Sequence, residues 1–82
     1  MTVSEALQVF GMTEKSIPNL DIIGMQSLIM NNNSFIMRTA SEREKQKTRY
    51  ENETLETLIR AAKEYKYEQE CAEKLKRKLR YS

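Results

Sequence analysis

Apolar residues crowd the first part of this chain and become sparse in the rest, which divides the sequence into two regions. Ile, Leu, Met, Phe and Val are concentrated in residues 1–37, together with Gly11, Gly24 and Pro18. Residues 38–82 contain no glycine or proline and are rich in Glu, Lys, Arg and Gln, with leucines and alanines at intervals. The pattern predicts an all-α protein with an apolar head of two short helices at 1–37 and one long charged helix at 38–82.

The first helix of the head is predicted at about residues 3–10. Thr2 and Glu5 have the spacing of a capping box, and Gly11 suits the left-handed residue that often closes a helix. The apolar residues aligned on one face are Val3, Ala6, Leu7 and Phe10. A helix of this length is not stable alone, so we expect it to dock against another element.

A second helix is predicted after a turn at residues 12–19, beginning at Pro18 or Asn19 with Asp21 near its positive end. One of its faces is expected to hold Leu20, Ile23, Ser27 and Met30. Apolar residues cover most of its circumference, which predicts burial on several sides. The polar run 31–34 predicts a break, although the helix could instead continue through it into residues 35–37.

The long helix should begin near residue 39, because Thr39 with Glu42 and Ser41 with Glu44 form overlapping capping boxes. About 40 residues at 1.5 Å each would extend about 60 Å. Its first part, residues 41–54, is polar on all sides. We expect this part to be a solvated stalk, with packing of the head against it as the alternative.

Apolar positions seven apart predict a coiled coil from about residue 55 onwards. The candidate seam consists of Leu55, Leu58, Ala62, Tyr65, Ala72, Leu75 and Leu79. Chains of this size often need oligomerisation to build enough core, and this favours a parallel homodimer. The alternative is a monomeric helical bundle in which the long helix folds back on the head.

The head carries more apolar residues than a core of its size can bury, which indicates a surface for a partner protein. The candidate partner-binding residues are Val3, Leu7, Phe10, Leu20, Ile23 and Met30. The last helix has no stop signal, so we expect the chain to be the N-terminal piece of a longer coiled-coil protein. The sequence therefore predicts a scaffold or assembly module that dimerises through the long helix and recruits another protein through its head.

Composition argues against catalysis and against a bound small molecule. The chain has no His, a single Cys and no glycine-rich loop, so it lacks the common general bases, zinc ligands and phosphate cradles. Cys71 is expected to stay reduced. We predict no catalytic, cofactor-binding or metal-binding residues, and no small-molecule substrate.

Charge is uneven and leaves a second functional possibility. Residues 1–37 hold one basic and three acidic groups, whereas residues 38–82 hold thirteen basic and nine acidic groups. The basic excess is densest near the end, at Lys74, Lys76, Arg77, Lys78 and Arg80. These cations could bind the phosphates of nucleic acid or an acidic membrane. With no export signal and no stretch long enough to span a bilayer, an intracellular location, cytoplasmic or nuclear, is expected.

Overall fold

The computed structural model describes the backbone of residues 1–81 and the side chains of residues 1–78, and its regular elements are all helical. In chain order they are α1 (Val3–Val9), the 3-10 helix η1 (Glu14–Asn19), α2 (Ile22–Arg38) and α3 (Glu42–Tyr81). The predicted all-α fold with one long C-terminal helix is confirmed. The molecule is a rod of 62 × 22 × 17 Å, and its length is set by the 40 residues of α3.

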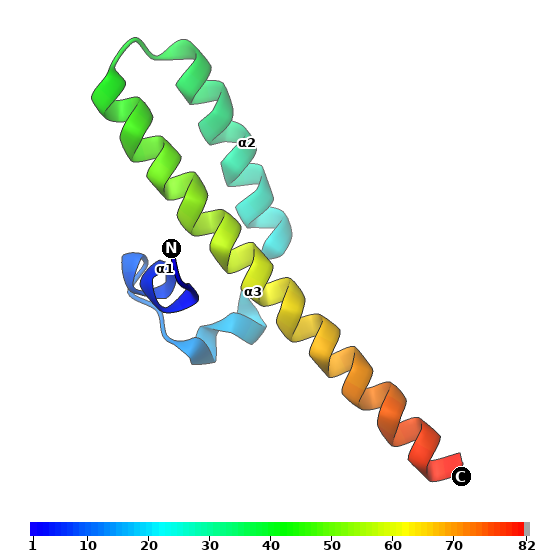
Figure 1. Cartoon of the computed structure of the whole chain (residues 1–82). Helices are drawn as coiled ribbons and strands as arrows, with labels where there is room; N and C mark the ends of the chain where they lie inside the picture. The colour runs from blue at the N-terminus through cyan, green and yellow to red at the C-terminus, as the bar shows by residue number, and fades with distance from the viewer. Residues whose placement is uncertain (82) are drawn as a thin grey trace.

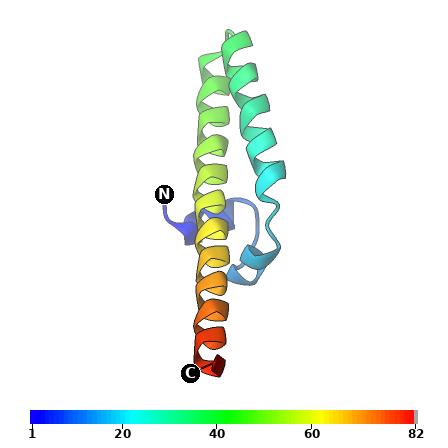
Figure 2. The same ribbon diagram turned by 90° about the vertical axis from the view of Figure 1, so that its right-hand side faces the viewer.

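α2 and the first half of α3 form an antiparallel hairpin whose connection is residues 39–41 (Figure 1). α1 and η1 pack on α3 near the middle of its length, on a different face from α2, and the second half of α3 projects beyond them (Figure 2). The head is therefore not a separate globule. Its elements are held together by α3, against which each of them packs.

The ends of α1 follow the sequence signals closely. The Thr2 hydroxyl accepts a hydrogen bond from the Glu5 backbone N–H at 3.2 Å, as the capping-box spacing predicts. Gly11 has a φ of 64°, and the backbone N–H of Met12 donates to the carbonyl of Leu7 at 2.8 Å. This left-handed turn closes the helix and brings Met12 back to the core beside Leu7.

α2 begins later and runs further than the predicted helix. Pro18 and Asn19 belong to η1, so the N-cap is Asp21, whose carboxylate accepts from the Gly24 N–H at 3.0 Å. The break expected at 31–34 is wrong, and the alternative of a continuous helix is observed. Part of the asparagine run is used for contact with α3 instead of ending the helix.

That contact is a side-chain network between the two long helices. The Asn32 amide donates to the Asn52 carbonyl oxygen at 2.9 Å, and the Asn52 amide donates to Asn33 at 3.0 Å. Asn52 is buried, so these bonds satisfy polar atoms that water reaches poorly. They also fix the register of α2 on α3, because each amide meets its counterpart at only one alignment.

Residues 52–62 of α3 are covered on most sides, so the solvated stalk predicted at 41–54 is wrong from residue 52 onward, whereas residues 42–51 are exposed apart from the half-buried Lys45 and Thr48. The core contains Ala6, Leu7, Met25, Leu55, Leu58 and Ile59, with Met12, Ile17, Leu20, Ile22 and Ile29 packed against it. Between residues 52 and 62 only Glu53, Glu56 and Arg60 are exposed. Their spacing marks a single narrow solvent face, so the head surrounds this part of α3 on its other sides.

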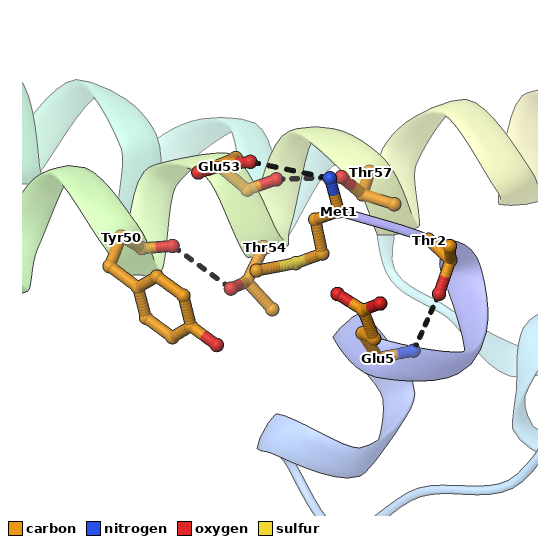
Figure 3. A network of polar contacts seen from close by, with 7 residues as sticks. All are labelled: Met1, Thr2, Glu5, Tyr50, Glu53, Thr54 and Thr57. Atoms are coloured by element: carbon orange, nitrogen blue, oxygen red, sulfur yellow. Dashed lines mark hydrogen bonds and ion pairs between the residues drawn. The ribbon is translucent and has the colours of Figure 1, made fainter.

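Polar groups on α3 in this region are accommodated locally. The hydroxyls of Thr54 and Thr57, both buried, donate to the backbone carbonyls of Tyr50 and Glu53 at 2.9 Å each (Figure 3). The Met1 ammonium lies 3.6 Å from a Glu53 carboxylate oxygen. This ion pair places the start of α1 over α3, and the exposed glutamate makes its contribution small.

Candidate protein-interaction surfaces

After the core has formed, three apolar surfaces remain open to solvent in the described part of the chain. One is a groove between α1 and α2, one is the outer face of α2, and one is a stripe on the second half of α3. Each is a candidate surface for protein contact, because exposed apolar side chains lose unfavourable hydration when they are covered.

The groove, called here the head groove, consists of two adjoining hollows that share Phe10. The inner hollow has a volume of about 360 Å³ and is apolar except at Asp21. Its lining residues are Phe10, Met12, Leu20, Asp21, Gly24, Met25, Leu28, Leu55 and Leu58. The outer hollow, of about 540 Å³, lies among Val9, Phe10, Phe35, Glu44, Lys47, Thr48, Tyr50 and Glu51. The geometry suits the side chains of an amphipathic helix laid along the groove.

The outer face of α2 carries three apolar side chains at sevenfold spacing. Ile23, Met30 and Met37 are 77%, 70% and 88% exposed. The opposite face of the same helix, toward α3, contains Ile22, Met25, Ile29, Asn32 and Ile36, all buried or half-buried. The predicted burial of this helix on several sides is therefore wrong, because it rests on α3 along one stripe only.

The stripe on the second half of α3, called here the distal face, contains Tyr65, Ala72 and Leu75. Tyr65 and Ala72 continue the sevenfold spacing of Leu58, and Leu75 follows Ala72 by three residues on the same side of the helix. All three are exposed, Tyr65 by 36% and Leu75 by 61%. Every described side chain from residue 63 to residue 78 is exposed, and the end of α3 projects beyond α1, η1 and α2 (Figure 1). An isolated helix of this length gains most of its stability from a partner.

The structure thus divides the predicted dimer seam. Leu55, Leu58 and Ala62 are almost fully buried against the chain's own head or beside it, so in this arrangement they are occupied. Tyr65, Ala72 and Leu75 remain available, and Leu79 lies outside the residues whose side chains are described. Dimerisation stays a prediction, and its available surface is restricted to the distal face.

The predicted partner-binding residues also fall in different places. Leu7 is 3% exposed and belongs to the core, which removes it from any docking surface. Phe10 and Leu20 line the head groove, and Val3 is partly exposed at the start of α1. Ile23 and Met30 lie on the outer face of α2, so the six residues do not form one site.

Sequence reasoning missed several residues of the groove, among them Val9, Leu28, Phe35 and Tyr50. Leu28 and Phe35 are seven residues apart, and this spacing was the available signal. It could not be assigned to a groove, because the position of α1 relative to α2 depends on how both pack on α3.

The predicted phosphate-binding cations lie on the projecting end of α3. Lys74, Lys76, Arg77 and Lys78 are exposed, and Arg80 lies outside the described side chains. Cys71 is an exposed free thiol in the same segment. Its side chain, one turn from Tyr67, raises the pKa of that phenol by hydrogen bonding and by charge repulsion.

In the described residues no three His, Cys, Asp or Glu side chains lie in a group that could hold a metal ion. Over the same part of the chain, no helix has the length and apolar character needed to cross a bilayer. Comparisons with protein families, curated proteins and solved structures found no match to this chain.

Proposed function

We propose that this protein is a non-enzymatic assembly module that self-associates through the distal face of α3 and holds a partner protein in its head groove. The observation that carries the proposal is the continuation of one apolar stripe from under the head, at Leu58 and Ala62, to the uncovered positions Tyr65, Ala72 and Leu75. A helix that has apolar side chains in register but no covering element needs one from another molecule.

Self-association is tested by light scattering coupled to gel filtration over a range of protein concentrations. Tyr65→Glu should lower the dimer fraction, because it places a charge on the distal face. Tyr67→Glu is the matched control, since Tyr67 is an exposed tyrosine two residues away and off the stripe. A mass that stays monomeric at every concentration would remove self-association from the proposal.

The partner that fits the head groove is an amphipathic helix with large apolar side chains at positions i, i+3 or i+4, and i+7. Because Glu44, Glu51 and Asp21 outnumber Lys47 around the groove, basic residues beside those anchors would improve the match. A designed helical peptide of this kind can serve as the probe. NMR shifts at the methyl groups of Met25 and Leu28 would support the groove, and shifts confined to other surfaces would contradict it.

Two other functions compete with this proposal, and each has an observation in its favour. The core closes within one chain, which supports a monomeric helical-bundle adaptor if the mass remains that of a monomer. Exposure of the cations from Lys74 to Lys78 supports binding to nucleic acid or an acidic membrane. Such binding should weaken steeply with salt, whereas groove binding, which is mainly apolar, should weaken much less. We also propose that the protein is located inside the cell.

A further inference from the structure

The outer face of α2 combines high exposure with an absence of charge. Ile23, Met30 and Met37 are the three most exposed large apolar side chains in the described part of the chain. Residues 22–37 contain no Asp, Glu, Lys or Arg. The solvent side of a surface helix ordinarily carries charged residues, whereas the centres of protein interfaces are depleted in charge and enriched in methionine. This face therefore has the composition of an interface.

The outer face is turned away from the other described elements. Each residue turns a helix by about 100°, so Met30 and Met37 lie about 200° round α2 from Leu28 and Phe35, which line the head groove. Met25, which packs toward α3, lies about 140° from Met30. No other element covers the side of α2 opposite α3 in the part of the chain that is described (Figure 1). A further helix can therefore cover the outer face without moving α1 or α3.

Large and small side chains alternate along this face. In order they are Ile23, Ser27, Met30, Ser34 and Met37, at steps of four and three residues, and all five are exposed. In a parallel pair in register each residue meets its own copy, so layers of two large side chains alternate with layers of two serines. In an antiparallel pair the two kinds of position face each other, so every layer holds one large and one small side chain. Because large against small packs best, the alternation favours a second copy in the antiparallel direction.

The charges at the two ends of α2 favour the same direction. Asp21 and Arg38 are the only charged residues between positions 20 and 41. The Arg38 Nε donates to the Ser34 carbonyl at 3.3 Å, which turns the guanidinium back along the helix. In a parallel pair each of these charges would lie at the same end as its own copy. In an antiparallel pair Asp21 of one protomer and the partner's Arg38 share an end, and unlike charges favour a pairing.

Both features agree in one register, in which the two helices cross between residues 28 and 29. Ile23 then lies opposite the partner's Ser34, and Ser27 lies opposite the partner's Met30. Twofold symmetry makes each of these contacts twice, which gives four packed layers. In the same register Arg38 is displaced from the partner's Asp21 by only two residues, about 3 Å along the axis.

We propose that the outer face of α2 binds the same face of a second copy of this chain, in the antiparallel direction and with the crossing between residues 28 and 29. This contact is separate from the predicted seam on α3 and does not rest on it. One helix pair of this length is a small interface, so the association should be weak. Together with the proposed contact of the distal face, it gives each copy two self-complementary surfaces, through which copies join into assemblies larger than a dimer.

Mass measurements on a Tyr65→Glu background isolate this contact from the distal face. At protein concentrations up to about 1 mM, which reveal weak association, the background protein should form dimers, and adding Met30→Lys should leave it monomeric. Leu28→Lys is the matched control, because it introduces the same charge two residues away on the groove side of α2, and it should keep the dimer.

The outcomes separate this contact from the proposed function. If the wild-type protein dimerises and the Tyr65→Glu protein stays monomeric, the distal face is supported and the outer-face contact is wrong. If Tyr65→Glu has no effect and Met30→Lys alone removes the dimer, the outer-face contact stands and the distal face is wrong. Equal loss of the dimer with Met30→Lys and Leu28→Lys would also overturn the outer-face contact.

Disulfide formation in a redox buffer tests the direction and the register. On a background of Tyr65→Glu and Cys71→Ser, Ile23→Cys and Ser34→Cys are prepared as separate proteins and mixed. In the antiparallel pair two copies of either variant hold their cysteines about 16 Å apart along the axis, beyond the reach of a disulfide, whereas one copy of each brings them together. The mixed disulfide should therefore exceed both symmetric ones. An excess of symmetric disulfides would overturn the direction, and equal yields of all three would overturn the register.

Discussion

The two halves of α3 are one continuous helix, yet their surroundings are opposite. Residues 52–62 are enclosed by α1, η1 and α2 on every side but one, whereas residues 63–78 are bare. Both halves carry the same sevenfold stripe, with Leu58 in the first and Tyr65 and Ala72 in the second. The difference teaches that sevenfold spacing identifies a face of the helix that another element can cover. Whether that element comes from the same chain depends on the other helices of the chain.

The covering elements are limited by length. α2 has 17 residues and α1 has seven, so together they can line only part of a helix of 40 residues. The chain reverses at residues 39–41, and α2 therefore lies along the first half of α3. In the described part of the chain, the side chains of the second half from residue 63 to residue 78 are left exposed.

The largest expected difference between the halves is in amide hydrogen exchange. In dilute solution, amides at 55–62 should be protected by several kcal/mol, approaching the free energy of global unfolding, whereas amides at 66–77 should exchange with little protection. Raising the concentration should protect the second segment selectively, because pairing covers it. Equal protection of both segments in the monomer would contradict the division of α3.

Matched leucine truncations should show the same contrast in stability. Leu58 is completely buried, so Leu58→Ala should reduce the free energy of unfolding by about 2–5 kcal/mol. Leu75→Ala removes the same atoms from a position that is 61% exposed and should have little effect on the monomer. Urea denaturation at low protein concentration measures both.

For self-association the order of the two variants should be reversed. Leu75→Ala should weaken the dimer more than Leu58→Ala does. A Leu58→Ala protein that keeps wild-type stability but fails to dimerise would show that Leu58 belongs to an intermolecular seam. That result would contradict the core described for the head.

The contrast between helix formation and helix contact also explains what could be predicted from the sequence. Caps such as Thr2 and Gly11 act on neighbouring backbone groups, so the ends of α1 are encoded locally and were predicted correctly. The continuity of α2 through its asparagines depends on Asn52, nineteen and twenty residues away from Asn33 and Asn32. Such pairing has no local signal, since polar residues in sequence equally favour a turn.

The predicted partner-binding residues are divided among several surfaces for a related reason. Ile23 and Met30 lie on one face of α2, as their spacing indicates, but Leu7 lies in the core because α3 covers it. An amphipathic pattern identifies which residues share a face and leaves open which face meets which helix. The head groove arises only when α1 and α2 are both placed on α3, so its lining could not be read from either helix alone.

Within the covered half of α3, loss of the asparagine network should have an effect of intermediate size on stability. Asn52→Ala leaves the side chains of Asn32 and Asn33 without their partner in a partly buried place, which should cost about 1–3 kcal/mol. Asn31→Ala is the control, because Asn31 is exposed on the same helix. Urea denaturation compares the two, and equal small losses would mean that the network adds no stability to the hairpin.

The smallest expected effect lies in the bare half and concerns Tyr67. Hydrogen bonding to Cys71, and to a smaller extent charge repulsion from it, raise the pKa of the Tyr67 phenol above its ordinary value. A raised pKa in the helix means that the neutral phenol is favoured there. This local stabilisation is present at neutral pH and is lost as the pH rises through the raised pKa.

Cys71→Ala should therefore lower the pKa of Tyr67 toward its ordinary value, as followed by NMR of the tyrosine ring during alkaline titration. Cys71→Ser should lower it less, since the serine hydroxyl keeps the hydrogen bond and removes only the charge repulsion. The pair is exposed, so neither change should shift the unfolding of the head. A Tyr67 pKa that does not respond to Cys71→Ala would mean that the two side chains do not interact across this turn of the bare helix.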